Sequence, residues 1–506
     1  MLRIDRKIRI YRIFTLLLVF FMIAQPLPAV QPAAADADSL LNAAPFNRAN
    51  WGVLITDHSG NSLFERNPDN LFIPASNLKL IVSAAASVLL GDNFTVTTSV
   101  FGTGPVENGV LQGDLVVYGR GDPTFSERCY GPDTTAAGAC ETMWSRTEML
   151  ADSIIAAGIR RIEGNLIGDG SYFESVMVHP AWEVYDLNWW YAAPVSALGF
   201  NDNSVNITWG PGTAVNAPAA VSFDPALGNF SFDNRARTLP EGERANIDFF
   251  RHPGSMSIWA EGGVPIDHGG RTEYFAMPDP NLYFVQALRA TLEQRGVGIT
   301  GSTTSTTDPN RHAYLLNSTP LVDFESKPVT DMVFPILNTS QNLFAETLLK
   351  LIGSQFGDHG SWSSGLEVTS RFLIDSIGID STAFLRRDGS GLAAGNLITP
   401  RAIVGLLRYM YAHPRNGAFM RGLPRAGKRG SLRNRFRGTS LAGRVVAKTG
   451  SVSRVAALSG YVEGEDSIPI FFSIIINNHP TSSRAASSRI DEFLVRTVTG
   501  MRQEEN

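Results

Sequence analysis

Hydrophobic and polar positions follow different periods in different parts of the chain. Five short segments have the pattern of strands: residues 51–57, 62–65, 444–449, 455–463 and 468–477. Five longer segments repeat their apolar residues with the spacing of a helix: residues 281–295, 342–352, 366–377, 400–411 and 487–498. Strands near both ends of the chain, with helices between them, predict one antiparallel sheet to which both ends contribute. This is an α+β architecture.

Residues 94–278 have a different texture. Short β-rich pieces alternate with turn signals such as Gly119-Arg120-Gly121-Asp122-Pro123, and one helix is predicted over residues 147–157. We interpret this region as an insertion of one or two mostly β domains. The insertion divides the core domain into residues 45–93 and 279–506.

The N-terminus has the three parts of a secretory signal peptide. A basic head of five Arg and Lys residues precedes a 12-residue apolar run over residues 13–24, and small residues follow up to Ala35, near which we expect cleavage. The run is too short to span a bilayer core of about 30 Å. Residues 1–35 are therefore predicted to export the chain to the periplasm or another extracytoplasmic compartment, and residues 36–47 to form a linker. The alternative is an uncleaved membrane anchor.

The stretch of residues 72–81 contains the first candidate for chemistry. Pro74 ends an extended segment, and Ser76 is suited to begin the apolar-patterned helix that follows. Lys79 lies three residues on and therefore on the same helix face, where its amine can reach the Ser76 hydroxyl. A serine hydroxyl is a weak nucleophile unless a base takes its proton, and a lysine whose pKa is lowered by burial can be that base.

By itself, Ser-x-x-Lys also describes an ordinary helix start with a solvated lysine. The chain, however, has only six lysines among its 43 basic residues. Arginine cannot be deprotonated near neutral pH, so a lysine where an arginine would serve as a surface cation favours a role that needs a neutral amine. Two further motifs follow downstream in the chain.

Ser340-Gln341-Asn342 is the second motif and stands just before a predicted helix. The Ser340 hydroxyl can pass a proton between a lysine and a leaving group, and the Asn342 amide can donate a hydrogen bond to a substrate carbonyl. The alternative is that the motif only caps the helix, because Ser and Asn are both favoured at a helix start.

Lys448-Thr449-Gly450-Ser451 is the third motif and ends a predicted strand. Lys448 can attract a substrate carboxylate, and Gly450 allows the backbone to approach a ligand closely. The strand edge can pair with an extended peptide, and the N–H of Ser451 can form an oxyanion hole with the N–H of Ser76. The alternative is an exposed lysine on an edge strand, which opposes aggregation.

Charge and cysteine content exclude some classes of partner. The net charge of −5 provides no overall basic surface, so nucleic acid is not an expected partner. Cys129 and Cys140 flank a short loop in the exported part, where an oxidising compartment favours a disulfide; two free thiols are the alternative. No histidine lies near these cysteines and no motif predicts a cofactor, so we expect neither a metal nor a cofactor.

The ordered set Ser-x-x-Lys, Ser-x-Asn and Lys-Thr-Gly resembles the serine penicillin-recognising superfamily. The long insertion between the first two motifs narrows the resemblance to the penicillin-binding protein 4 type, the S13 family of D-alanyl-D-alanine carboxypeptidases. The resemblance covers about residues 45–500 and implies a β-lactamase/transpeptidase-like core, an antiparallel sheet flanked by helices. Five further stretches look like this family: residues 119–123, 191–198, 340–346, 388–392 and 458–461.

The resemblance also implies a role for each motif residue: Ser76 is the acylated nucleophile, Lys79 its base, Ser340 the proton relay, Asn342 a ligand of the substrate amide, and Lys448 with Thr449 the holders of the terminal carboxylate. Ser451 stands where the family often has threonine, so the hydroxyl is kept. Residues 388–392 are expected to shape the cleft without taking part in the chemistry.

The resemblance therefore predicts a serine D-alanyl-D-alanine carboxypeptidase that hydrolyses peptidoglycan stem peptides through an acyl-enzyme on Ser76. DD-endopeptidase activity is a further option, and β-lactams are the expected inhibitors. A β-lactamase is one alternative, but residues 183–188 are one residue too long for its Glu-x-x-Leu-Asn motif and lie in the insertion, so we treat the match as chance. The other alternative is a catalytically weak penicillin-binding protein that senses or scaffolds the cell wall. None of the eight histidines lies in a motif, so a Ser-His-Asp triad has little support.

Overall fold

The computed structural model describes residues 32–131, 140–227, 230–464 and 468–504. Most of the predicted signal peptide lies outside these residues, and residues 32–35 begin helix α1 (Pro32–Asn42). Leu40 and Leu41 of α1 are buried in a core shared with α10 (Ser483–Glu504). The linker predicted over residues 36–47 is therefore wrong, because much of this segment packs as a helix. Within the described part of the chain, every helix is too short or too polar to span a membrane.

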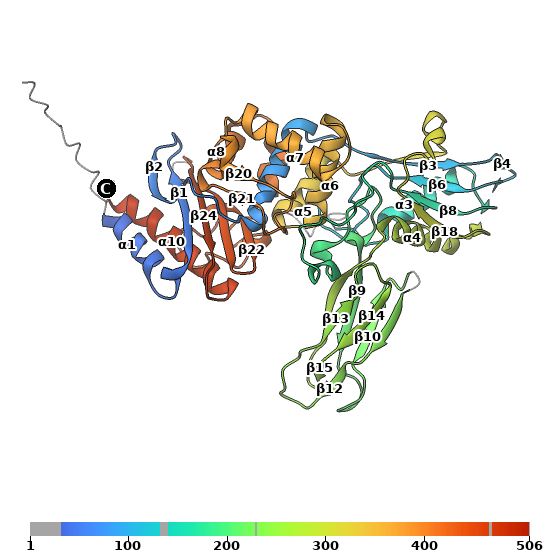
Figure 1. Cartoon of the computed structure of the whole chain (residues 1–506), viewed down its shortest axis with the longest axis horizontal. Helices are drawn as coiled ribbons and strands as arrows, with labels where there is room; N and C mark the ends of the chain where they lie inside the picture. Colours follow the sequence, from blue (N-terminus) through green and yellow to red (C-terminus); the bar gives the residue numbers. More distant parts are fainter. Residues whose placement is uncertain (1–31, 132–139, 228–229, 465–467, 505–506) are drawn as a thin grey trace, which may run out of the picture.

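One five-stranded antiparallel sheet forms the centre of the first domain. Its strands run in the order β2-β1-β24-β23-β22, with the bounds β1 (Asn50–Thr56), β2 (Ser62–Arg66), β22 (Val445–Val452), β23 (Val455–Val462) and β24 (Ile470–Asn477). Trp51 pairs with Ile476, so strands from the two ends of the chain lie side by side, as Figure 1 shows. The predicted sheet and the α+β fold class are confirmed.

Helices cover both faces of this sheet. Val53 and Ile474 are buried with α1 and α10, whereas Leu54 and Ile475 point into a second core that contains the remaining helices. These helices are α2 (Lys79–Ala85), α5 (Val329–Asn338), α6 (Asn342–Phe356), α7 (Trp362–Arg371), α8 (Pro400–Ala412) and α9 (Gly417–Gly422). All the predicted helices of this domain are present. We did not predict α5, because Pro335 interrupts it and its apolar run over residues 332–337 is too short to be told from a buried strand by pattern alone.

The insertion has three parts, and the first is a mixed α/β unit of residues 97–169 and 280–325. It contains one sheet of order β18-β8-β6-β3-β19, a second sheet of order β17-β7-β5-β4, and two helices. The bounds are β3 (Thr97–Gly102), β4 (Val106–Glu107), β5 (Val110–Leu111), β6 (Leu115–Tyr118), α3 (Ser145–Ala156), β7 (Arg161–Ile162), β8 (Leu166–Asp169), α4 (Pro280–Gln294), β17 (Gly298–Ile299), β18 (Thr303–Thr306) and β19 (Val322–Glu325). Cys129 and Cys140 are joined by a disulfide in this unit.

The end of the insertion lies beyond residue 278, where the sequence pattern placed it. The predicted helix α4 exists, but it buries Phe284 and Leu288 in the core of the mixed α/β unit. The strands that follow α4 also belong to this unit, because β17 and β18 pair with β7 and β8, and β19 pairs with β3. The boundary at residue 278 is therefore wrong, and the first domain resumes with α5. The insertion is also less purely β than predicted, since two helices pack in it.

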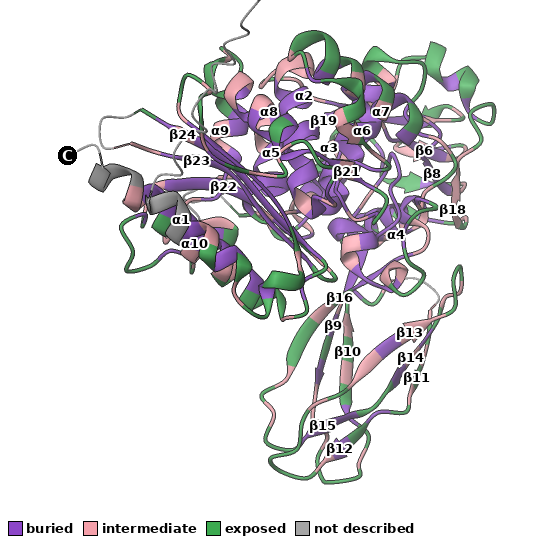
Figure 2. Ribbon diagram, turned by 60° about the vertical axis from the view of Figure 1, so that its left-hand side comes forward, coloured by how far each residue is buried: buried purple, intermediate pink, exposed green. Residues whose placement is uncertain are grey.

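The other two parts of the insertion are a distal β unit (residues 204–276) and a bridging segment (residues 170–203). Figure 2 shows the distal β unit projecting away from the rest of the molecule. Its strands are β9 (Ser204–Gly210), β10 (Ala220–Asp224), β11 (Ser231–Asn234), β12 (Arg237–Leu239), β13 (Asp248–Arg251), β14 (Ser257–Glu261), β15 (Gly263–Pro265) and β16 (Arg271–Ala276). The regular structure of the bridging segment is limited to three 3-10 turns: η4 (Asp186–Asn188), η5 (Trp190–Ala192) and η6 (Asn201–Asn203).

Candidate active site

Ser76 lies in the turn that begins the predicted helix. Ala75–Leu78 form a 3-10 turn, η2, which runs directly into α2, and no side chain caps it. The Ser76 hydroxyl is therefore not used as a cap, and its Oγ instead accepts a hydrogen bond of 2.8 Å from Lys79 Nζ, as the spacing of the two residues predicts. Ala75 has a φ of 48°, a conformation that non-glycine residues rarely adopt, so the backbone just before Ser76 is strained.

Lys79 is fully buried beneath Ser76. Its Nζ also donates a hydrogen bond of 2.7 Å to the carbonyl oxygen of Ser390. Burial lowers the pKa of Lys79 to about 7, although the carboxylates of Glu346 and Asp388 act in the opposite direction. A substantial fraction of the amine is therefore neutral at neutral pH and can accept the Ser76 proton.

Ser340 connects α5 to α6 with a left-handed backbone, at a φ of 67°. Gln341, and not Ser340, caps α6, because the Gln341 side chain accepts a hydrogen bond from the Leu343 N–H. The Ser340 hydroxyl accepts a hydrogen bond of 2.8 Å from Lys448 Nζ. The second motif therefore does more than begin a helix: its serine meets the lysine of the third motif.

Lys448 is fully buried on β22. Its Nζ donates hydrogen bonds of 2.8 Å to Ser340 Oγ and to the carbonyl oxygen of Thr449. Burial, with a smaller contribution from Lys79, holds the pKa of Lys448 well below its usual range. This burial excludes the alternative of an exposed lysine on an edge strand. The Lys448 amine contacts Ser340, whereas the sequence predicted that it attracts a substrate carboxylate.

Gly450 allows two motifs to pack against each other. A Cβ at this position would lie 2.6 Å from the carbonyl oxygen of Pro74 and 3.2 Å from the backbone nitrogen of Asn77. These distances are shorter than a side chain can tolerate, so only glycine lets β22 pack directly on η2. The close approach predicted for Gly450 exists, but the partner is the turn that carries Ser76.

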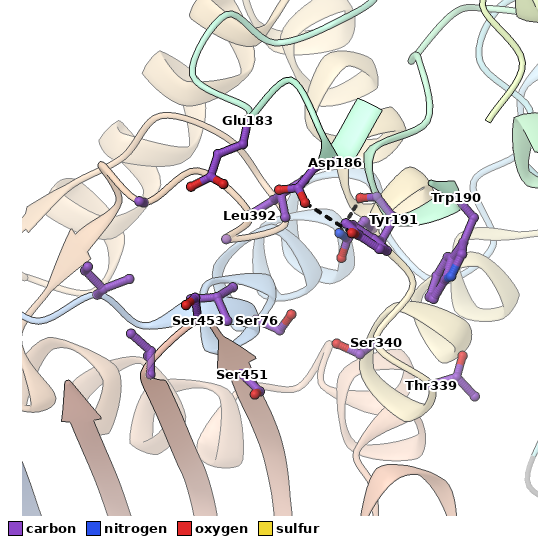
Figure 3. A pocket seen from close by; sticks show the side chains of 16 residues that line it. Ser76, Glu183, Asp186, Trp190, Tyr191, Thr339, Ser340, Leu392, Ser451 and Ser453 are labelled. Carbon is purple, nitrogen blue, oxygen red and sulfur yellow. Dashed lines mark hydrogen bonds between the residues drawn. The ribbon is translucent and has the colours of Figure 1, made fainter. Parts of the chain in front are cut away.

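A cleft of about 530 Å³ opens above these residues, as Figure 3 shows. Ser76, Ser340, Asn342 and Ser451 line it from the first domain, and Lys79 and Lys448 lie behind the serines. The bridging segment supplies the opposite wall with four side chains: Glu183, Asp186, Trp190 and Tyr191.

Sequence reasoning missed this opposite wall. Residues 183–188 were treated as a chance match to another family's motif, yet Glu183 and Asp186 reach the cleft. No local signal identifies them, because their position depends on how the insertion folds back on the first domain. Among the described residues, no group of His, Cys, Asp and Glu side chains is arranged to hold a metal.

The bridging segment also holds the second motif in place. The carbonyl oxygen of Tyr191 accepts a hydrogen bond of 2.6 Å from Asn342 Nδ2, and the Asp202 carboxylate accepts one of 2.6 Å from Gln341 Nε2. Arg128 donates to the same Asp202 carboxylate. The Asn342 amide has two N–H groups, so one N–H and the carbonyl oxygen are left for a substrate.

Residues 388–392, for which we predict no chemical role, contact the Ser76–Lys79 pair. The Ser390 carbonyl accepts a hydrogen bond from Lys79. Gly391 has a φ of 85°, and a Cβ there would lie 2.0 Å from the carbonyl oxygen of Ala75. The loop is thus pressed against the turn that carries Ser76. The glycines predict a loop here, but not what the loop touches.

Comparisons with known proteins agree with this geometry. The D-Ala-D-Ala carboxypeptidase 3 (S13) family matches residues 33–497. The chain is 31% identical over 457 residues to a D-alanyl-D-alanine carboxypeptidase of an Actinomadura species, over 88% of this chain and 80% of that protein. It is 26% identical over 540 residues to penicillin-sensitive carboxypeptidase A of Dictyostelium discoideum, over 96% of this chain and 98% of that protein.

A solved structure shows the same fold. The crystal structure of penicillin-binding protein 4 from Haemophilus influenzae matches with a TM-score of 0.78 at 22% identity, over 93% of this chain and 99% of that one. The predicted resemblance is confirmed, and the chain belongs to the S13 family of D-Ala-D-Ala carboxypeptidases, which makes it a serine-type carboxypeptidase.

Proposed function

We propose that this protein removes the terminal D-Ala from peptidoglycan stem peptides through an acyl-enzyme on Ser76. The observation that carries the proposal is the contact of 2.8 Å between Ser76 Oγ and the fully buried Lys79 Nζ, at the floor of a cleft of about 530 Å³. A lysine with a pKa of about 7 is matched to taking and returning a proton at neutral pH.

Acylation starts with neutral Lys79. Ser76 Oγ attacks the carbonyl carbon of the penultimate D-Ala while its proton passes to Lys79 Nζ. The oxyanion accepts hydrogen bonds from the backbone N–H groups of Ser76 and Ser451. The peptide C–N bond then breaks, and the departing D-Ala nitrogen takes up a proton. Water later attacks the ester, which releases the shortened peptide and regenerates Ser76.

Ser340 and Lys448 relay the proton to the leaving group. Lys448 Nζ donates to Ser340 Oγ, so the hydroxyl hydrogen of Ser340 is free to point into the cleft. Ser340 can donate this hydrogen to the departing nitrogen and recover one from the lysines. Ser451, near the open end of β22, is left to bind the terminal carboxylate, and Asn342 binds the substrate amide. The Thr449 hydroxyl, which the resemblance gave the same role, donates to Ser431 Oγ at 2.9 Å and is not among the residues that line the cleft.

The acidic wall of the cleft suggests which peptides fit best. Glu183 and Asp186 line the cleft, whereas none of the Lys and Arg residues that the structure describes does. A carboxylate in a partly desolvated cleft stabilises a cationic group of the substrate. We therefore infer a preference for stem peptides that carry a free side-chain amine. Peptidoglycan lies outside the cytoplasm, in agreement with the signal peptide predicted at residues 1–35.

β-Lactams are expected to acylate Ser76 as slow substrates. A related structure, penicillin-binding protein 4 of Haemophilus influenzae, has been solved as a complex with a β-lactam. The first test is mass spectrometry after incubation with a fluorescent penicillin. The adduct is expected on the peptide that contains Ser76 and is expected to be absent in Ser76→Ala. Full labelling of folded Ser76→Ala would rule out this nucleophile.

Two more assays test the proposed roles and the rivals. Lys79→Arg keeps a cation but cannot act as a base, so its acylation rate should fall by about 10²–10⁴-fold. D-Ala release measured beside β-lactam hydrolysis separates the carboxypeptidase from the two alternatives. A β-lactamase would turn over the antibiotic quickly, and a sensor would bind it without releasing D-Ala from peptides.

A further inference from the structure

Glu346 is a buried carboxylate next to the active site that the mechanism above does not use. It lies one turn after Asn342 on α6 and is fully buried. Its Oε1 accepts a hydrogen bond of 2.7 Å from the Ser390 N–H, and its Oε2 accepts bonds of 2.9 Å from the Gly389 N–H and from Trp362 Nε1. A buried carboxylate is tolerated only when its oxygens are bonded in this way.

These bonds fix the Gly389–Ser390 peptide group, which directly precedes the peptide group that contacts Lys79. Glu346 holds the N–H of Ser390, and the carbonyl of Ser390 accepts the hydrogen bond of 2.7 Å from Lys79 Nζ. A neutral lysine amine has two N–H groups and one lone pair. When the Ser390 carbonyl engages one N–H, the amine can no longer rotate freely, and its lone pair can be directed at the hydroxyl of Ser76.

We propose that Glu346 is a positioning residue for acylation: it holds Ser390 from its N–H side, so that the Ser390 carbonyl keeps Lys79 oriented with its lone pair toward Ser76. Its negative charge also acts on Lys79. The proposal rests on the function of Lys79 as the base. Glu346 is not a catalytic residue in this scheme, because it touches neither Ser76 nor the cleft.

The charges around Lys79 determine the direction of the electrostatic effect. Burial lowers the pKa of Lys79, Glu346 and Asp388 raise it, and the neighbouring amine is that of Lys448, whose own pKa burial lowers. Lys350, one turn further along α6, is the other charged group near Glu346. Burial and the nearby Asp388 in turn raise the pKa of Glu346 itself. Removal of the Glu346 charge should therefore lower the pKa of Lys79.

Asp388 differs from Glu346 in what it holds. Its carboxylate accepts hydrogen bonds from Gly391 N, Ala393 N, Asn396 Nδ2 and Trp182 Nε1. The Gly391 N–H belongs to the same peptide group as the Ser390 carbonyl, whereas Glu346 binds the N–H groups of Gly389 and Ser390, on the other side of Ser390. The two carboxylates thus share the electrostatic effect and hold Ser390 from opposite sides.

The test compares variants by the rate of acylation with fluorescent penicillin between pH 5 and pH 9. Glu346→Gln removes the charge and places an amide N–H group where a backbone N–H needs an acceptor. We expect the plateau rate to fall about ten- to hundredfold and the acidic limb of the profile to move to lower pH. Glu346→Asp keeps the charge but draws the oxygens back, so the limb should stay in place while the plateau falls.

Trp362→Phe is the matched control. It removes one donor to Glu346 but leaves the charge and both backbone bonds, so its limb should not move and its plateau should stay within about threefold of wild type. Circular dichroism and thermal melting report whether each variant folds. A Glu346→Gln profile with an unmoved limb would overturn the proposal and leave only a structural role. A wild-type acylation rate in Glu346→Asp would overturn the proposal as well. This second variant keeps the proposal testable if Glu346→Gln does not fold.

The same experiment separates this proposal from the proposed function. If wild-type protein is not labelled on Ser76, the proposed function fails. If wild type is labelled with an acidic limb that Lys79→Arg abolishes, but Glu346→Gln behaves as wild type, only the role of Glu346 fails.

Discussion

The bridging segment and the distal β unit belong to the same insertion but are attached to the protein in opposite ways. The bridging segment has few regular elements, yet Phe173, Trp182 and Val195 are buried in the helical core of the first domain. The distal β unit consists of regular strands, and its buried residues, such as Phe249 and Ile258, group with the mixed α/β unit. Among the described residues, no hydrogen bond or ion pair joins the distal β unit to the first domain.

The polar contacts show the same contrast. The bridging segment binds α6 at several points: at Gln341 and Asn342, and at Lys350, whose Nζ donates to the carbonyl oxygen of Val176 at 2.9 Å. The distal β unit contacts the bridging segment through Arg251, which donates to the carbonyl oxygen of Leu187. The irregular part of an insertion can thus complete an active site, while its regular part stays separate from the chemistry.

The largest effect is expected from Lys350→Ala. Lys350 is fully buried, contacts Glu174 at 3.2 Å, and lies 3.6 Å from the centre of the Trp362 ring. Loss of one partner from a buried pair costs about 3–5 kcal/mol, and partial exposure of Glu174 places this case near about 3 kcal/mol. Urea unfolding should show this loss of stability.

The control for this variant lies in the distal β unit. Arg271 forms an exposed ion pair of 3.3 Å with Glu273, and Arg271→Ala should cost less than about 1 kcal/mol. A Lys350→Ala variant as stable as Arg271→Ala would show that the bridging segment is not anchored through this lysine.

The second prediction concerns pH. Lys79 must be neutral to accept a proton, and its pKa of about 7 means that the acylation rate should rise with pH and level off above this value. Below it, the rate should fall about tenfold for each pH unit, or about a hundredfold at pH 5. This pKa is set by burial in the first domain and by the charges of Glu346 and Asp388, which lie outside the distal β unit. The acidic limb of the pH profile should therefore be unchanged in a protein without the distal β unit. A displaced limb would contradict the conclusion that this unit is separate from the active site.

The third prediction tests the acidic wall that the bridging segment provides. Asp186 is half-buried, and Tyr191 donates a hydrogen bond of 3.1 Å to it. Asp186→Asn should lower kcat/KM about five- to tenfold for peptides with a free side-chain amine, which corresponds to about 1–1.4 kcal/mol. It should leave kcat/KM unchanged for peptides whose side-chain amine is acetylated. Equal losses for both peptides would show that Asp186 supports the wall without recognising a cation.

The smallest effect is expected when the distal β unit is removed. Ile207 of β9 pairs directly with Glu273 of β16, so the chain can be rejoined there through a two-residue Asn-Gly turn. The acylation rate of the shortened protein should stay within about threefold of wild type, because no described residue of the removed part lines the cleft. A loss above tenfold in a folded variant would show that the unit supports the site through the bridging segment.

Most elements and the three motifs could be predicted from local sequence patterns. Strand and helix patterns depend on neighbours two to four positions apart, so β1, β22, β23 and β24 and most helices could be predicted locally. The contact of Ser76 with Lys79 is equally local, since both lie on one helical turn. Helix α5 was not predicted because Pro335 interrupts its short apolar run, which resembles a buried strand as much as a helix.

Contacts between elements that are far apart in the sequence depend on the tertiary structure. No periodicity reveals that β17 and β18 pair with strands of the insertion, and so the boundary at residue 278 was wrong. In the same way, only packing brings Lys448 to Ser340, the Ser390 carbonyl to Lys79, and the carboxylates of Glu183 and Asp186 to the cleft. These contacts join residues about 100 to 300 positions apart, and they exist because buried polar groups must find partners wherever the folded chain supplies them.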